Sequence, residues 1–269
     1  TALVLLGACL LAACQPKLVI IHTNDTHSHL EPVRSGDNDG LGGAIERAAI
    51  IDSIRGRYGE DRVLLLHGGD FSQGTSYFTL LGGRVEDEVI NAMGYDCITL
   101  GNHELDNGLE ELAKRVKRID CPIVCANIDF TGTGIDEKVK PYAVLERGGM
   151  KIGIIGLEAD VASNVAAAVR KGIRTLDVVE QVNRWSEYLN ETEKCDLVLL
   201  LSHQGYDEDQ EIIAASRGLD LVVGGHSHTR IDRIRFFRDD RSRHEQGNQR
   251  QDRQNYPHLP RFLNHNLAR

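Results

Sequence analysis

The chain has 269 residues, and its hydrophobic content of 41% is enough to bury one substantial core, or two if it divides. The 40 acidic and 31 basic side chains give a formal charge of -9, which repels phosphate polyanions unless cations intervene locally. This balance argues against a nucleic-acid partner, and the length favours one large α/β domain.

The first residues, Thr1 to Ala13, are almost wholly apolar but too few to span a bilayer as a helix, which is typical of the core of an export signal. Because no Met and no basic residue precede them, we expect the true start to lie upstream. Leu11-Ala12-Ala13-Cys14 resembles the bacterial lipoprotein box, in which cleavage precedes a cysteine that is then acylated. We therefore expect residues 1–14 to be a lipoprotein-type signal. The protein would be exported to the periplasm or cell envelope, with membrane contact only through a lipid on Cys14. The alternative is an ordinary buried cysteine within a signal.

Short apolar runs of strand length recur along the rest of the chain, with amphipathic stretches between several of them. The predicted strands are Leu18 to Ile21, Val63 to Leu66, Cys97 to Leu100, Pro122 to Val124, Ile152 to Ile155, Leu197 to Leu201 and Leu219 to Val223. The predicted helices are Ala44 to Arg57, Val85 to Met93, Leu109 to Arg118, Val178 to Asn190 and Asp209 to Ser216. This alternation predicts an α/β fold with largely parallel, right-handed βαβ connections.

The segment 232–269 differs in character, being rich in Arg, Gln, Asn and His without periodic apolar positions. Such a composition buries too little surface to offset its ordering entropy. We expect an atypical, disordered tail rather than a basic interaction arm.

Four cysteines remain after the signal, and none has zinc-ligand spacing: Cys97, Cys121, Cys125 and Cys195. We interpret them as small buried thiols. Export would permit a disulfide, but the sequence assigns none.

Five polar clusters follow five of the apolar runs, which places them at the carboxyl ends of strands, where open α/β sheets build their sites. They are Asp25-Thr26-His27, Gly69-Asp70, Gly101-Asn102-His103-Glu104, Ser202-His203 and Gly225-His226-Ser227-His228. The neighbouring glycines let the backbone turn and approach a ligand closely. Each cluster alone is weak evidence for a metal site, but the occurrence of all five in one chain argues against a purely structural role.

Two divalent cations held close together need several ligands from separate strands and one bridging carboxylate. Asp25 and His27, alternating on an extended segment, can face one cation, together with His228. Asp70 is the natural bridge, and Asn102, His203 and His226 suit the second cation. Because the set is all oxygen and nitrogen, Zn, Mn, Co or Fe are all admissible.

The order of these clusters resembles the calcineurin-like metallophosphoesterases, and the residues around them resemble the bacterial 5'-nucleotidase and UDP-sugar hydrolase family. The resemblance rests on the segments from Ile21 to Pro32, Gly69 to Thr75 and Gly101 to Gly108. It implies a four-layer α/β/β/α sandwich over residues 18–231 with a binuclear metal site at the carboxyl ends of the strands.

The resemblance also implies a metal-dependent phosphoesterase that acts on small phosphorylated substrates such as nucleotides, by in-line attack of an activated water. His103 would face the phosphate as a catalytic residue rather than a ligand, with Asp106 fixing its tautomer. Asp106 could instead be a helix N-cap. His29 is a weaker candidate for a substrate contact.

The family's C-terminal nucleotide-binding domain has no counterpart in the printed sequence, so we expect that a separate domain could act in trans. A non-catalytic metal-binding lipoprotein or an inactive truncated fragment is the alternative of a different class.

Overall fold

The computed structural model describes residues 17–36 and 39–230 and the backbone of residues 264–266. Its strands are β1 (Val19–Thr23), β2 (Val63–His67), β3 (Cys97–Thr99), β4 (Ile123–Val124), β5 (Ile128–Asp129), β6 (Val139–Lys140), β7 (Tyr142–Arg147), β8 (Met150–Leu157), β9 (Arg174–Thr175), β10 (Leu197–Ser202), β11 (Leu221–Gly224) and β12 (Asn264–Asn266). The helices are α2 (Ala44–Tyr58), α3 (Ser76–Leu81), α4 (Arg84–Met93), α5 (Leu109–Val116), α6 (Val161–Asn164), α7 (Ala167–Arg170), α8 (Val178–Glu191) and α9 (Tyr206–Ala215), with 3-10 turns η2 (Glu60–Arg62) and η3 (Asn102–Leu105).

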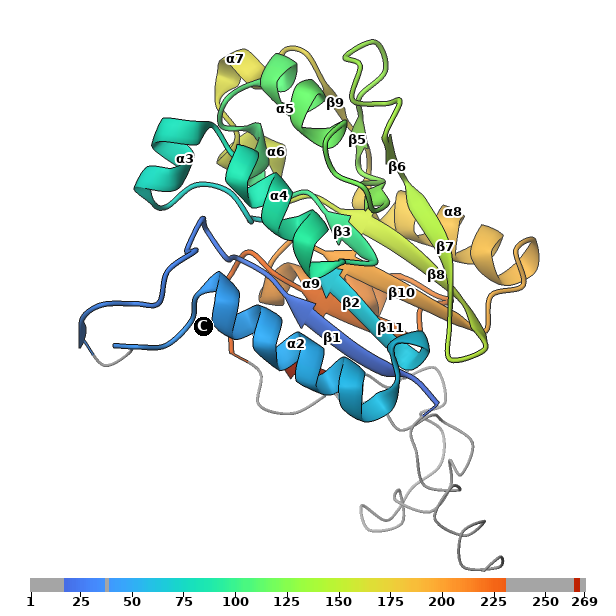
Figure 1. Ribbon diagram of the computed structural model, residues 1–269. Helices are drawn as coiled ribbons and strands as arrows, with labels where there is room; N and C mark the ends of the chain where they lie inside the picture. Colours follow the sequence, from blue (N-terminus) through green and yellow to red (C-terminus); the bar gives the residue numbers. More distant parts are fainter. Residues whose placement is uncertain (1–16, 37–38, 231–263, 267–269) are drawn as a thin grey trace, which may run out of the picture.

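Two main sheets organise these elements (Figure 1). The first has the order β12-β1-β2-β3-β4-β6 and is parallel throughout. The second has the order β11-β10-β8-β7, in which only β7 runs antiparallel to its neighbour. Because parallel neighbours end at the same edge, each sheet gathers the loops after its strands along one edge.

The apolar strands of the first sheet are buried on both faces. Val19 and Ile21 of β1 pack in a cluster with Ile51 of α2, Ile90 of α4 and Leu112 of α5. Residues of alternate parity point the other way, since successive side chains of a strand face opposite sides. This second set includes Ile20, Leu64 and Leu66, and it packs in one cluster with Ile152 and Ile154 of β8 and Leu199 and Leu201 of β10 in the second sheet.

The second sheet is covered on its outer face by α8 and α9. Val182 and Leu189 of α8 and Ile212 of α9 pack with Val198 and Leu200 of β10. Going through the molecule, the elements therefore follow the order helices, sheet, sheet, helices. Burial of two sheet faces against each other explains why these strands are continuous apolar runs rather than alternating ones.

The predicted α/β class with parallel connections is confirmed. Strand β7, whose side chains are mostly half-buried at a sheet edge, and the two-residue strands β5, β6 and β9 were not predicted from the sequence. Of the segment 232–269 the structure describes only Asn264–Asn266, which pairs with β1, so the expected disordered tail lies outside the described residues, as do the signal segment and Cys14.

The four cysteines of the described part are free thiols, with Cys97 and Cys125 buried and Cys121 and Cys195 partly so. No helix in the described ranges combines the length and the apolar character needed to cross a bilayer.

Candidate metal centre

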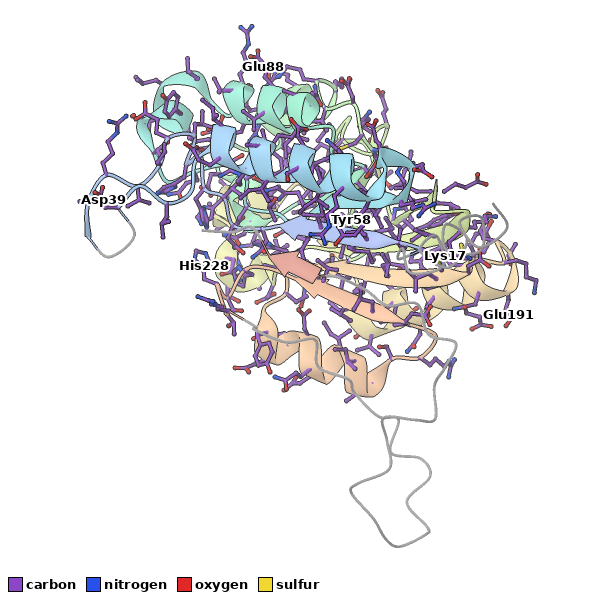
Figure 2. The ribbon with its side chains drawn as sticks, turned by 60° about the horizontal axis from the view of Figure 1, so that its bottom comes forward. Lys17, Asp39, Tyr58, Glu88, Glu191 and His228 are labelled. Atoms are coloured by element: carbon purple, nitrogen blue, oxygen red, sulfur yellow. The ribbon has the colours of Figure 1, made fainter. Side chains whose placement is uncertain are left out.

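The polar clusters predicted from the sequence meet at one edge of the molecule. Asp25 and His27 follow β1, Asp70 follows β2, and Asn102 opens the 3-10 turn after β3. The second sheet adds His203 directly after β10, and His226 and His228 directly after β11. Figure 2 shows His228 at this edge, on the segment that leaves β11. Residues as far apart in the sequence as His27 and His228 thus face each other, because the strands that precede them end at the same edge of the molecule.

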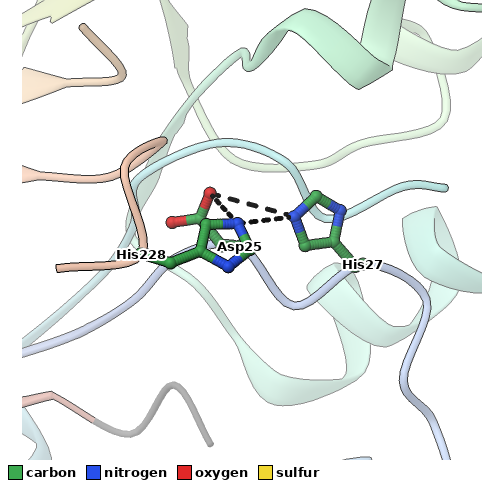
Figure 3. Close-up of side chains that lie close together, drawn as sticks. All are labelled: Asp25, His27 and His228. Carbon is green, nitrogen blue, oxygen red and sulfur yellow. Dashed lines mark hydrogen bonds and ion pairs between the residues drawn. The ribbon is translucent and has the colours of Figure 1, made fainter. Parts of the chain in front are cut away.

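In the described part of the chain, three groups of side chains have the spacing of metal ligands, and two of them share no residue. Asp25, His27 and His228 form one, with their ligand atoms within 4.8 Å of one another (Figure 3). In it, His27 Nε2 lies 3.1 Å from His228 Nε2, and His228 Nε2 lies 3.4 Å from Asp25 Oδ1.

Asp70, His203 and His226 form the other group. Asp70 also forms the third group, together with His27 and His103. Its Oδ2 lies 3.9 Å from His27 Nε2. The Asp70 carboxylate therefore stands between the two groups, as a bridging ligand must.

The chemistry of these residues fits a cation pair. Asn102 Oδ1 is buried and has no hydrogen-bond partner among the described residues, and the buried His203 Nε2 lies 3.0 Å from Asp70 Oδ2. Burial is the main cause that lowers the pKa of His27 and of His226, which favours the neutral imidazole with a free lone pair on each residue. Carboxylate oxygen, amide oxygen and neutral imidazole together are donors that suit transition metals or zinc.

The backbone that carries these side chains is in an uncommon conformation. Positive φ angles of 44° to 71° occur at Asp25, His27, Asp70, His226 and His228. The expectation that Asp25 and His27 alternate on an extended segment is therefore wrong, because both are in the left-handed region. Asp, Asn and His tolerate this region better than other residues do, and such strain concentrates at functional sites.

Glycines surround His203, the most deeply buried imidazole of the centre. A Cβ on Gly101 would lie 2.3 Å from Asp70 Oδ1 and 2.7 Å from His203 Nε2. A Cβ on Gly69, which also has a positive φ of 87°, would lie 2.7 Å from His203 Nδ1. That Nδ1 donates its proton to the carbonyl of Gly68 at 2.6 Å, which leaves Nε2 to face Asp70. The glycines noted in the sequence thus serve close approach, as expected.

His103 lies next to the first group, with its ring centroid 5.3 Å from that of His27 in an edge-on arrangement. Its Nδ1 is 2.7 Å from Asp106 Oδ2, so this carboxylate fixes the orientation of the ring. The other ring nitrogen, Nε2, is not used in this contact. Asp106 ends the 3-10 turn, and Gly108 precedes α5, so the alternative of Asp106 as a helix N-cap is wrong.

Glu104 supports the site in a way that the sequence pattern did not predict. Its carboxylate is fully buried and accepts hydrogen bonds from three backbone N–H groups, those of Asp70, Ser72 and Gly101, at 2.7 to 3.0 Å. It thereby joins the loops after β2 and β3. Part of this was indicated by the sequence, because a Glu three residues after the residue that begins a turn is placed to accept from the backbone N–H of that residue, here Gly101.

The remaining histidines near the centre are not in either group. His29 is exposed, and its Nδ1 lies 2.9 Å from the carbonyl of His27. His67 is buried and packs below the centre: its Nδ1 accepts from the N–H of Gly69, and its Nε2 lies 3.2 Å from Thr26 Oγ1. Burial places the pKa of His67 well below its ordinary value, so it is a neutral supporting residue.

Known proteins share this arrangement of sequence and fold. Residues 18–230 match the family described as calcineurin-like phosphoesterase. The chain is 35% identical over 221 residues to a probable 5'-nucleotidase of Treponema pallidum, covering 79% of this chain and 37% of that protein. It is 34% identical over 220 residues to the NAD 5'-nucleotidase of Haemophilus influenzae, covering 79% and 36%.

A solved structure of a 5'-nucleotidase precursor from Thermus thermophilus superposes with a TM-score of 0.71 at 34% identity, covering 78% of this chain and 41% of that one. The chain therefore spans less than half the length of the relatives that it matches.

Proposed function

The chain belongs to the calcineurin-like phosphoesterase family, whose members use two divalent metals, and we propose that it hydrolyses phosphate esters of the nucleotide class. The observation that carries this proposal is the position of the Asp70 carboxylate between two groups of ligand atoms. We assign Asp25, His27 and His228 to one cation and Asn102, His203 and His226 to the other, with Asp70 shared. These residues come from both sheets, so the folded domain alone would assemble the site.

The cations would supply neutralisation of phosphoryl charge and a more acidic attacking water. The side chains of the protein would position the substrate and transfer the proton. The carboxylate of Asp106 holds Nδ1 of His103, so Nε2 is the atom that carries a proton to the leaving oxygen or stabilises the transferring group. The backbone N–H of His103 donates to Asp70 Oδ1 at 3.0 Å, which fixes the position of His103 relative to the bridging carboxylate.

An open cleft of about 310 Å³ lies beside the His27–His29 segment. It supports the proposal because it offers room for the organic part of a phosphate ester. Its wall includes His29, Leu30, Pro32 and Tyr77, and Thr75 fixes one side by donating to the carbonyl of Ser28 at 2.9 Å. This volume is within the range of small-molecule sites. Apolar and aromatic contact of this kind holds a base without selecting among bases.

For this chain by itself, we propose weak and unselective nucleotide binding. A separately encoded C-terminal nucleotidase domain that docks in trans would supply base selectivity. The test is a panel of AMP, GMP, UMP and p-nitrophenyl phosphate, assayed with the chain alone and with added chelator. Similar metal-dependent rates at high Michaelis constants are expected, and submicromolar, base-selective binding would contradict this division of labour.

Export and lipidation at Cys14 are also proposed, on the support of Leu11-Ala12-Ala13-Cys14 at the end of an apolar run. The full-length protein should fractionate with membranes in a bacterial host, and Cys14→Ala should release it. Recovery of soluble wild-type protein with an uncut signal would refute the lipid anchor.

A further inference from the structure

A small, partly open cavity lies beneath the segment that carries His27. Its volume is about 10 Å³, which is about the space that one water molecule requires. Its wall brings together Ser28 from that segment, Arg47 from α2 and Glu86 from α4. Thr26, His67 and Tyr95 also line it, but Thr26 pairs with His67 and Tyr95 pairs with Thr23.

The three side chains named first carry polar atoms without partners. Glu86 is 2% exposed, and neither of its carboxylate oxygens has a hydrogen-bond partner in the described structure. The Nε of Arg47 and the Oγ of Ser28 are likewise buried and unpartnered among the described residues. Leaving such groups unsatisfied costs about 1–3 kcal/mol each, and more for charged groups, so buried polar atoms of this kind are normally bridged.

The charges on the wall decide what can bridge them. Within the described ranges no ion pair joins Arg47 to Glu86, since both carboxylate oxygens of Glu86 and the Nε of Arg47 are without partners, although both side chains line the cavity. The guanidinium disfavours a bare cation there, and the carboxyl group disfavours an anion. A neutral molecule that donates to Glu86 and accepts from Arg47 Nε satisfies both, and only water is small enough.

We propose that this cavity binds one ordered water that joins Glu86, Arg47 and Ser28. Arg47 also donates from Nη1 to the carbonyl of His29 at 3.2 Å, so the bridge reaches the metal segment at two points. His27 and Ser28 both have positive φ, and such strained backbone persists only when its surroundings hold it. Glu86 and Arg47 are therefore positioning residues for His27, a role that rests on the proposed metal assignment.

The functional test is a Zn²⁺ titration of the metal-stripped chain against a chromophoric chelator, which separates two binding steps. Glu86→Leu should weaken the step assigned to Asp25, His27 and His228 by about 10–100-fold, the usual effect of losing an outer-shell partner, and leave the other step unchanged. Glu86→Gln keeps an acceptor oxygen and should stay near wild type. Glu88→Leu is the matched control, because Glu88 lies on the same helix with its side chain 61% exposed (Figure 2).

Glu86→Leu removes the carboxylate that shares the cavity with the buried Arg47 guanidinium, so the double variant Arg47→Met/Glu86→Leu is measured beside it, with folding checked by far-UV circular dichroism. The same selective loss in the folded double variant supports the positioning role. Unchanged binding, or equal weakening of both steps, would overturn it.

A high-resolution crystal structure tests the water itself, independently of any activity. It should show a water within about 2.7–3.2 Å of Glu86 and of Arg47 Nε. A direct Arg47–Glu86 ion pair or a dry cavity would refute the site, whereas an inactive enzyme with the water in place would refute only the proposed function.

Discussion

His203 Nε2 lies 3.0 Å from Asp70 Oδ2, and both side chains are almost completely buried. The pair joins the loop after β10 in one sheet to the loop after β2 in the other. Burial opposes the charged form of each group, yet their mutual contact lowers the pKa of Asp70 to about 2 and raises the pKa of His203 to about 10. In the metal-free chain the two form a buried ion pair.

This pair predicts how the stability of the metal-free protein depends on pH. The Asp70 contribution is full above its ordinary pKa of 3.8 and is lost as pH falls through about 2. The His203 contribution is full below its ordinary pKa of 6.5 and is lost as pH rises through about 10. The contribution of the pair to stability is therefore greatest between pH 3.8 and pH 6.5, the ordinary pKa values of the two groups.

Denaturant melts of metal-stripped wild type and Asp70→Asn across this range measure the effect. The difference in unfolding free energy should shrink as pH rises from 6.5 toward 10. A difference that does not change with pH would mean that the pair is not charged.

Asp70→Asn should bring the metal content below two per chain and remove nearly all activity, because an amide cannot bridge two cations as a carboxylate does. Mass spectrometry of the purified variant gives the metal content, and Asp52→Asn on the exposed side of α2 is the control. Two-metal occupancy in active Asp70→Asn protein would end the bridging assignment.

His103→Ala should keep both metals while slowing turnover by at least about a hundredfold, since it removes only the proton-transfer group. Asp106→Asn should have a smaller effect, because it disturbs the ring only through Nδ1. His103 also lies within ligand distance of His27 and Asp70, so metal analysis is essential. Loss of a metal from His103→Ala would reassign this residue as a ligand.

Glu104→Gln should lower the free energy of unfolding by about 1–3 kcal/mol, because one amide oxygen cannot accept from all three backbone N–H groups. Urea melts of the metal-loaded protein measure this, with Glu110→Gln on the exposed face of α5 as the control. Equal stability of the two variants would show that the three hydrogen bonds are dispensable.

Most of the strands that the sequence predicted are almost completely buried, with the half-buried edge strand β11 as an exception. Strands such as β1 and β10 have apolar side chains on both faces and stand out as continuous runs, whereas β7 lies at an edge and mixes Tyr142 and Glu146. The residues brought together at the metal centre could be predicted because parallel strands end at one edge.

What could not be predicted was the local backbone and the supporting contacts. Nothing in the order of residues indicates that Asp25 and His27 have positive φ, since this depends on how their loop packs against the loop after β2. The meeting of Arg47 and Glu86 at one cavity likewise depends on how α2 and α4 pack.

The most direct test of the central claim is reconstitution of the metal-stripped chain with Zn²⁺ or Mn²⁺ while hydrolysis of p-nitrophenyl phosphate is followed. Activity should be absent without metal and should rise to a plateau at two equivalents per chain, with Asp70→Asn inactive throughout. Activity that persists in excess chelator, or a folded chain that binds two metals and hydrolyses no phosphate ester, would contradict a two-metal phosphoesterase.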